Sequence, residues 1–151
     1  MPDAPADDAA LAAPFRPRLA RVVTLAIAVA VLALTALLVT TMPGLSPLDQ
    51  TGFVLFGVAI AWFCWRQATV AAVPDATGLR VRNLLVTTHV TWAQIVSVRF
   101  GQGRPWVQLD LSDGDTLAVM GVQRADGEHA EHEARRLATL VARRSATASD
   151  D

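Results

Sequence analysis

Residues 22–41 read VVTLAIAVAVLALTALLVTT, a run of twenty residues that contains no charged residue, no glycine and no proline. An α-helix rises about 1.5 Å per residue, so a helix of this length extends about 30 Å, the hydrocarbon thickness of a bilayer. The threonines are compatible with that environment, because a hydroxyl can donate to a carbonyl of the preceding helical turn. The run therefore predicts a first transmembrane helix over residues 22–41.

The residues before this helix divide into a polar tail and a basic flank. Residues 1–17 (MPDAPADDAALAAPFRP) are rich in Ala, Pro and Asp and show no apolar periodicity, and we expect a disordered tail over residues 1–21. Arg16, Arg18 and Arg21 stand directly before the apolar run. A signal peptide also begins with positive charge, but its apolar region has only about 7–15 residues and ends at a small-residue cleavage site. We therefore expect an uncleaved helix.

A second apolar run follows the segment 42–50 (MPGLSPLDQ), whose prolines and glycine predict a short loop outside the membrane. Residues 51–66 (TGFVLFGVAIAWFCWR) are marginal for a span, and a buried helix of a globular domain is the alternative. Trp62 and Trp65 cluster at one end and Arg66 follows them, as is typical of a membrane interface. We expect a second transmembrane helix over residues 51–66.

Small residues in both apolar runs could let the two helices approach closely. They form the pairs Ala26 with Ala30 and Gly57 with Ala61, each spaced four residues apart. Cys64 is the single cysteine of the chain, so no intrachain disulfide can form, and we expect it to be a small apolar packing residue.

The arginines predict how the two helices are oriented. Three precede the first helix and Arg66, Arg80 and Arg82 follow the second, whereas the loop 42–50 has none. Cytoplasmic flanks of membrane spans are enriched in Lys and Arg. The pattern therefore predicts a multi-pass protein of the inner membrane with both termini in the cytoplasm.

From residue 68 onward the apolar period changes from that of a helix to two, the period of a half-buried strand. Turn signals (PDATG, GQGRP and SDGD) separate the runs, so we expect six antiparallel strands in a meander. A short helical or bulged crossing should bury Trp92 and Ile95. The six runs are ATVAAV (68–73), GLRVRN (78–83), LLVTTHV (84–90), VSVRF (96–100) with Val96, Val98 and Phe100 inward, WVQLDL (106–111) and TLAVMGV (116–122).

The last part of the chain predicts an amphipathic helix that begins at Asp126 as its N-cap. Its apolar stripe consists of Ala130, Ala134, Leu137 and Val141, and one stripe needs one surface to cover. We therefore expect a small α+β domain over residues 68–144, an antiparallel β roll or partial barrel capped by this helix. Residues 145–151 are polar and are expected to be a disordered tail.

The GLRVRN strand, TWAQIVSVRF, PWVQLDLSDGDTLAVMGV and the terminal helix, in this order, resemble the small bacterial PH-like domain common in actinobacterial membrane proteins. The chain's bias towards alanine and arginine fits a GC-rich bacterial genome. The resemblance implies a PH-like roll with a C-terminal helix, so the expected fold class is a membrane α-helical hairpin plus a PH-like domain. The family is generally of uncharacterised function, and phosphoinositide binding comes only by analogy with eukaryotic PH domains.

Arg99, Arg104 and Trp106 surround the GQGRPW turn and are the candidate binding residues. An arginine and a tryptophan at a hairpin tip could bind a lipid headgroup or anchor a partner chain. Alternatively, the tryptophan packs at the barrel rim and the arginines are solvated. Residues 66–151 contain ten arginines and ten acidic residues, so they lack the positive excess that nucleic-acid binding needs, and we expect no nucleic-acid partner.

Catalytic and metal-binding patterns are weak in this sequence. His129 and His132 lie three residues apart beside Glu133, but a zinc site needs three or four converging ligands, and a solvated helix face is the better interpretation. His89 alternates outward on a strand. No nucleophile, base and orienting group occur at recognisable spacing, so we expect a protein that is not an enzyme and holds no cofactor.

These observations predict a membrane-tethered PH-like interaction or scaffold module, a non-catalytic subunit of a membrane complex. Its expected partners are the bilayer and another membrane protein, and a homo-oligomer is a further arrangement. Tethering raises the effective concentration of the domain near other membrane components. The alternative function is recognition of lipid headgroups through Arg99, Arg104 and Trp106.

Overall fold

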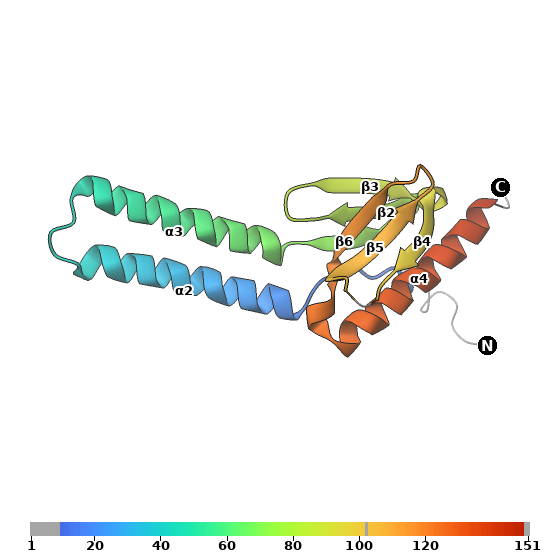
Figure 1. The fold of residues 1–151 in the computed structure, drawn as a ribbon, viewed down its shortest axis with the longest axis horizontal. Helices are drawn as coiled ribbons and strands as arrows, with labels where there is room; N and C mark the ends of the chain where they lie inside the picture. The colour runs from blue at the N-terminus through green and yellow to red at the C-terminus, as the bar shows by residue number, and fades with distance from the viewer. Residues whose placement is uncertain (1–9, 102, 150–151) are drawn as a thin grey trace. The chain divides into compact units, whose positions relative to one another are not determined.

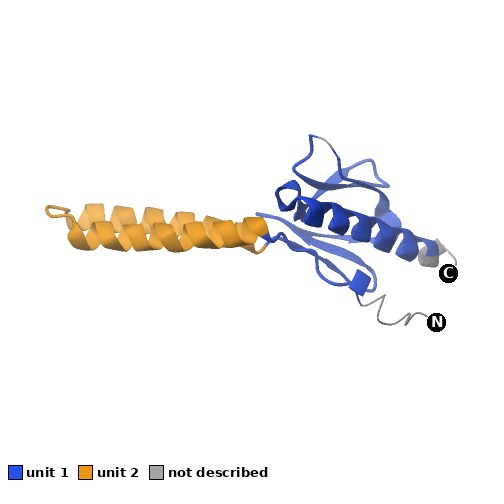
Figure 2. Cartoon of the chain, turned by 90° about the horizontal axis from the view of Figure 1, so that it is seen from below, with its two compact units in different colours: residues 1–18, 70–151 blue, residues 19–69 orange. Residues whose placement is uncertain are grey.

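The computed structural model describes residues 10–101 and 103–149 of the 151-residue chain. The chain forms two compact units, one of residues Leu19–Thr69 and one that combines the residues up to Arg18 with those from Val70 onward (Figure 2). We call them the helical hairpin and the β domain. The β domain is therefore built from both sides of the hairpin in the sequence.

The helical hairpin consists of α2 (Leu19–Thr41) and α3 (Pro47–Ala68), two antiparallel helices joined by a short loop (Figure 1). Both are long and apolar enough to cross a membrane. α3 begins at Pro47 and not at Thr51, so the predicted loop 42–50 is too long. Proline is compatible with the first turn of a helix because its missing N–H has no helical partner there.

A capping box starts α3. The Asp49 N–H donates to the Ser46 hydroxyl at 3.2 Å, and the Ser46 N–H donates to the Asp49 carboxylate at 3.1 Å. Two N–H groups at the helix start are thereby satisfied. Pro47, the second proline of the predicted loop, is therefore the first residue of α3, although we expected it to lie in the loop.

The hairpin places small residues inside and bulky apolar residues outside. The buried residues of its helices are Ala28, Gly57, Cys64 and Ala68. Leu34 and Phe56, by contrast, are 64% and 68% exposed. The packing role predicted for Cys64 is confirmed.

Gly57 is the tightest contact in the hairpin. A Cβ atom at this position would lie 2.4 Å from the Thr35 Oγ1, so only glycine fits without movement. Gly57 thus acts as the small-residue prediction requires. The prediction is wrong for α2, because Ala26 and Ala30 are exposed and Ala28 faces α3 instead.

The β domain contains two three-stranded antiparallel sheets and a C-terminal helix, which confirms the predicted architecture (Figure 1). A short 3₁₀-helix (Trp92–Gln94) links the sheets and buries Trp92. The elements are β1 (Ala71–Pro74), β2 (Gly78–Arg82), β3 (Thr87–Thr91), β4 (Ile95–Arg99), β5 (Trp106–Leu111), β6 (Thr116–Gln123) and α4 (Glu128–Ser149).

One core lies between the sheets and α4. The alternating residues of β2 and β5 and the predicted stripe of α4 all point into it. Asn83 holds the two sheets together, because its side chain donates to the Ala118 carbonyl at 2.8 Å and accepts from the Met120 N–H at 3.1 Å. The main core residues are Phe15, Leu79, Val81, Trp92, Ile95, Val107, Leu109, Val119, Ala130, Ala134, Leu137 and Val141.

β4 differs from its prediction at Val96, which is 66% exposed. The pairing of β4 with β5 shifts register between Ile95 and Ser97, and such a bulge interrupts the alternation of side chains. Val98 and Phe100 are partly buried against the core as expected. The bulge therefore turns one predicted core residue to the surface.

Residues 10–18, which we call the N-terminal strap, are an ordered part of the β domain. Phe15 is fully buried, and its N–H and carbonyl pair with the carbonyl and N–H of Ala72 at 2.8 and 3.0 Å. The Arg136 guanidinium lies 3.9 Å from the centre of the Phe15 ring and donates to the Ala10 and Ala13 carbonyls. The predicted disorder is therefore wrong for these residues, while residues 1–9 lie outside the described part.

Both ends of the C-terminal helix also differ from prediction. Asp126 belongs to a 3₁₀ turn, and Gly127, with a φ of 57°, separates it from α4. The Asp126 carboxylate accepts a hydrogen bond from the Arg18 N–H at 2.9 Å, so Asp126 holds the strap and is not the N-cap of α4. α4 continues to Ser149, and the Ser145 hydroxyl donates to the Trp92 carbonyl. The predicted tail is thus helical to residue 149, and residues 150–151 lie outside the described part.

Candidate functional site

The predicted binding residues Arg99, Arg104 and Trp106 lie along the hairpin of β4 and β5. Arg99 forms an ion pair with Asp110, which also accepts a hydrogen bond from the Ser97 hydroxyl. The Ser97 hydrogen bond, and then the charge of Arg99, lower the pKa of Asp110 below its usual value. The Arg99 guanidinium is therefore engaged across the two strands.

Arg104 and Trp106 are also tied to their neighbours. The Arg104 guanidinium donates to the Gln108 side-chain oxygen. Trp106 is half-buried at the start of β5 and lies opposite Gln123 of β6. The structure thus brings the three residues to one β-hairpin, where each arginine binds a side chain of β5 and, after the serine hydrogen bond, the charges of both lower the pKa of Asp110.

His89 takes part in a turn that is held by Asp75. The Asp75 carboxylate accepts from the Thr77 hydroxyl at 2.8 Å and from the Thr77 and Gly78 N–H groups at 2.9 Å, and it lies 3.0 Å from the His89 Nε2. These hydrogen bonds, that of the Thr77 hydroxyl foremost, lower the pKa of Asp75 to about 2. The cluster closes the turn between β1 and β2.

His132 and Glu133 do not form a ligand set with other residues. Glu133 forms an ion pair with Arg136 at 2.6 Å, and the His132 side chain is 70% exposed. Within residues 10–101 and 103–149, no three His, Cys, Asp or Glu side chains lie together in a metal-binding arrangement.

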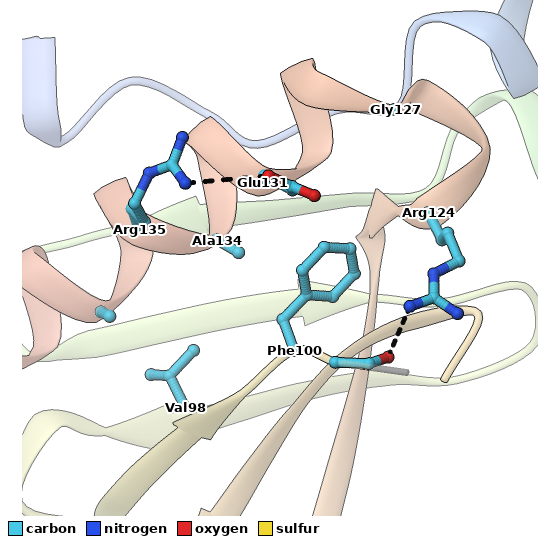
Figure 3. Close-up of a pocket in the computed structure, with 9 residues that line it drawn as sticks. Val98, Phe100, Arg124, Gly127, Glu131, Ala134 and Arg135 are labelled. Atoms are coloured by element: carbon cyan, nitrogen blue, oxygen red, sulfur yellow. Dashed lines mark hydrogen bonds and ion pairs between the residues drawn. The ribbon is translucent and has the colours of Figure 1, made fainter. Parts of the chain in front are cut away.

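A cleft that the sequence did not indicate lies between β4 and α4 (Figure 3). Its volume is about 490 Å³. We call it the β4–α4 cleft. Its lining residues are Val98, Phe100, Gly101, Arg124, Gly127, Glu131, Ala134, Arg135 and Ala138.

The cleft has an apolar floor and a charged rim. Val98 and Phe100 point from the sheet towards Ala134 of the helix (Figure 3). Ala138, four residues after Ala134 on α4, also lines the cleft. Alanines on the helical wall leave room that larger side chains would fill. The rim carries the guanidinium groups of Arg124 and Arg135.

Neither rim arginine is held tightly by a carboxylate. Arg124 donates to the Gly101 carbonyl at 3.0 Å, and Arg135 lies 3.8 Å from the Glu131 carboxylate, a long ion pair between exposed side chains. Such exposed pairs contribute little energy. Both guanidinium groups can therefore interact with a further acceptor.

A second hollow of about 440 Å³ adjoins the first on the other side of Arg135. No acidic residue lines it. Its lining residues are Ala10, Leu11, His132, Arg135, Arg136, Thr139 and Arg143. The Arg136 guanidinium is neutralised by Glu133, so the exposed positive charge of this part of α4 comes from Arg135 and Arg143.

The strand beside the cleft is an edge strand. β4 pairs with β5 alone, because the strand order in its sheet is β4, β5, β6. An edge strand presents backbone N–H and carbonyl groups on its open side. The sequence could not show this, since strand order depends on pairing between distant segments.

Comparison with known proteins finds similarity to a described family over part of the β domain. Residues 69–139 match the family described as bacterial PH domain. The chain is 31% identical over 95 residues to the uncharacterized protein Rv1417 of Mycobacterium tuberculosis and to the uncharacterized protein Mb1452 of Mycobacterium bovis. The match spans 63% of this chain and 62% of each relative. No solved structure matches the chain.

Proposed function

Because residues 69–139 of this chain belong to the bacterial PH domain family, we propose that the β domain is a membrane-tethered interaction module and binds a partner protein in the β4–α4 cleft. The protein then serves as a non-catalytic subunit of a membrane complex. The helical hairpin anchors it, and the cleft recognises the partner.

The cleft is the observation that carries this proposal. It combines an apolar floor, a charged rim and an open strand edge, which are the features that give a protein interface its anchor, its orientation and its backbone hydrogen bonds. The pair of small residues Ala134 and Ala138 gives the cleft its depth. A surface that only covered the core would not need such a recess.

The anchoring role is supported by the hairpin and by the strap. Phe15 precedes the hairpin and Ala72 follows it, so their pairing requires both ends of the segment between them to lie on one side of a membrane. Two crossings satisfy this requirement and a single crossing does not. The arginines on the outer flanks favour the cytoplasm as that side.

Headgroup recognition by Arg99, Arg104 and Trp106 receives less support. Both guanidinium groups already bind side chains of β5, and a headgroup would have to displace these contacts. The proposal also assigns no catalysis to the domain. Asp75 and Asp110 have lowered pKa values because hydroxyl groups donate to them, which is the environment of a turn or sheet carboxylate rather than of a general acid.

The proposed function is tested by purifying the full chain from native membranes in mild detergent. We expect reproducible recovery of a partner with the wild type and its loss with Ala138→Phe, which fills the cleft. Ala142→Phe is the matched control, because Ala142 is exposed on the same helix and does not line the cleft. Recovery of the protein alone, or equal recovery with both variants, would contradict the proposal.

The orientation is tested by thiol labelling in a Cys64→Ala background. Ser46→Cys in the loop should react with a membrane-impermeant reagent added to intact cells, and a reporter fused after Asp151 should be active in the cytoplasm. A protected Ser46→Cys together with an external reporter would show the inverse orientation. An external reporter together with a labelled loop would show that α3 does not span.

A further inference from the structure

This inference rests on the proposed function and specifies its partner. We infer that the β4–α4 cleft receives an extended segment of a partner protein, which adds to the edge of β4 as a further strand. The segment carries an apolar side chain over Val98 and Phe100 and an acidic side chain against Arg124 and Arg135.

The backbone of β4 has an open edge that can pair with a further strand. β4 has a strand neighbour on one side only, and the cleft opens along its other side, next to α4. An added strand satisfies the open N–H and carbonyl groups, and its alternate side chains reach opposite faces. Val96 is 66% exposed at the start of this edge and offers apolar contact to the added strand.

The shape of the cleft suits an apolar side chain of the added strand. Ala134 is buried and Ala138 is exposed on the wall of α4 that faces the cleft. With Val98 and Phe100 opposite, they form an apolar slot that accepts an inward-pointing side chain of the added strand. A volume of about 490 Å³ is within the range of sites that bind ligands.

Charge selects the partner. The rim has two guanidinium groups and one carboxylate, and the adjoining hollow adds the guanidinium of Arg143, while that of Arg136 is paired with Glu133 at 2.6 Å. Residues 66–151 contain equal numbers of arginines and acidic residues, so this local excess is not a property of the whole domain. The complementary segment is acidic.

The same charge argues against a second copy of this chain as the occupant. A symmetric dimer through this surface would bring two Arg135-centred clusters together, and like charges repel across an interface. A neutral or acidic surface of another protein avoids this repulsion. The occupant is therefore a different protein, which contributes an extended acidic segment.

The test uses the full chain in nanodiscs and, as its probe, a display library of random dodecapeptides. We expect the enriched peptides to combine β-branched or aromatic residues with Asp or Glu, and their affinity to fall with added salt. In hydrogen exchange, a bound peptide should protect the amides of Val96–Arg99. Protection there reports strand addition, which side-chain contacts alone would not give.

Variants of the cleft locate the site. Ala138→Phe and Arg135→Glu should each weaken the selected peptides about tenfold or more, as removal of an interface anchor does, while Ala142→Phe should not. Unchanged exchange in β5 and β6 controls for folding. Should Ala138→Phe alter the fold, Arg124→Gln with Arg135→Gln tests the same site at two exposed positions.

Each other outcome overturns the inference. Peptides without acidic residues, protection outside β4, or equal binding by the Ala138→Phe variant would each refute it. Self-association lost in Ala138→Phe would identify a second copy as the occupant. If no peptide is enriched while the partner recovered from membranes is still lost in Ala138→Phe, strand addition is refuted and the proposed function stands; if neither binds, both fail.

Discussion

The helical hairpin and the β domain bury opposite kinds of side chain. In the β domain the largest fully buried side chains include those of Phe15, Leu79 and Leu109. In the hairpin the buried residues are small, and bulky ones such as Phe56 lie on the outside. One chain thus uses two packing rules, and the difference is the one expected if the β domain faces water and the helical hairpin faces lipid.

Water drives bulky apolar side chains into the β domain, because removal of apolar surface from water is the main favourable term in folding. Lipid supplies no such force between helices, so they associate by close approach of their backbones, which small residues permit. The distribution of side-chain size is therefore itself a sign of the surroundings of each unit.

The largest effect that we predict comes from the same substitution made in both units. Phe15→Ala should destabilise the β domain by about 3–5 kcal/mol, because it leaves a cavity in the core and removes the ring beneath Arg136. Phe56→Ala should leave the β domain unchanged, since Phe56 is 68% exposed in the hairpin. Hydrogen exchange of the full chain in detergent measures the two units separately.

A loss of this size is a large part of the total stability of a small domain. Phe15→Leu should recover most of it, because it restores apolar volume. Equal exchange in Phe15→Ala and wild type would mean that the strap does not contribute to the core.

A smaller effect is expected in the hairpin, where adding side-chain volume, and not removing it, should destabilise the packing. Gly57→Ala should destabilise helix packing by about 1–3 kcal/mol, because the added Cβ meets the Thr35 hydroxyl at 2.4 Å. Gly52→Ala in the same helix is the control, since that position has open space. The measurement is thermal unfolding of the hairpin in detergent, monitored by hydrogen exchange of the amides of α2 and α3.

A second substitution distinguishes crowding from other causes. Thr35→Ala removes the hydroxyl that the new methyl group meets, and it should restore part of the stability lost in Gly57→Ala. If the double variant is no better than the single one, the close contact of these two residues is not what limits the packing.

A third prediction concerns the pH dependence of the stability of the β domain. The pKa of Asp75 is lowered from 3.8 to about 2 in the folded state, so its stabilising effect is present above about pH 4 and is lost as the pH falls towards 2. Asp75→Asn should therefore be less stable than wild type near neutral pH, and the difference should vanish towards pH 2.

Urea unfolding of the β domain at several pH values checks this prediction. Asp113→Asn is a matched control in another turn, where the carboxylate accepts one N–H from Asp115. A constant difference between Asp75→Asn and wild type over the whole pH range would exclude the charge of Asp75 as the cause.

The smallest effect is expected at the hairpin of β4 and β5. Arg99→Ala with Arg104→Ala should change the stability of the β domain by less than about 1 kcal/mol, because their ion pair and hydrogen bond lie at the surface. We also expect hydrogen exchange of β4 and β5 in nanodiscs to be the same with neutral and with anionic lipid. Protection that depends on lipid charge and is lost in this variant would instead support headgroup recognition.

The sequence predicted the parts of this fold that depend on local pattern. Leu79 and Val81 alternate with arginines, and Ala130, Ala134 and Leu137 follow the helical period, so their burial could be read from neighbouring residues. The first apolar helix was clear from its length and absence of charge, whereas the second was marginal in length and was indicated by Trp62, Trp65 and Arg66 at its end.

What could not be predicted depends on partners far away in the sequence. Phe15 is a single aromatic residue among Ala and Pro, and its partner Ala72 comes only after the whole hairpin. Val96 fits the alternation, yet a bulge turns it outward. The β4–α4 cleft depends on which strand lies at the sheet edge. Arg99, Arg104 and Trp106 were predicted as binding residues from their residue types near a turn, without knowledge of the side chains that they contact.

The pairing of Phe15 with Ala72 also sets an order of events during synthesis. The strap leaves the ribosome first, and its partner strand follows only after both apolar helices have been made. Until then Phe15 has no core to enter, and the sheet lacks the strand beside which the strap pairs. Completion of the β domain therefore requires that both apolar helices have already been translated. In the proposed topology it also requires that the chain has returned to the side of the membrane on which the strap lies.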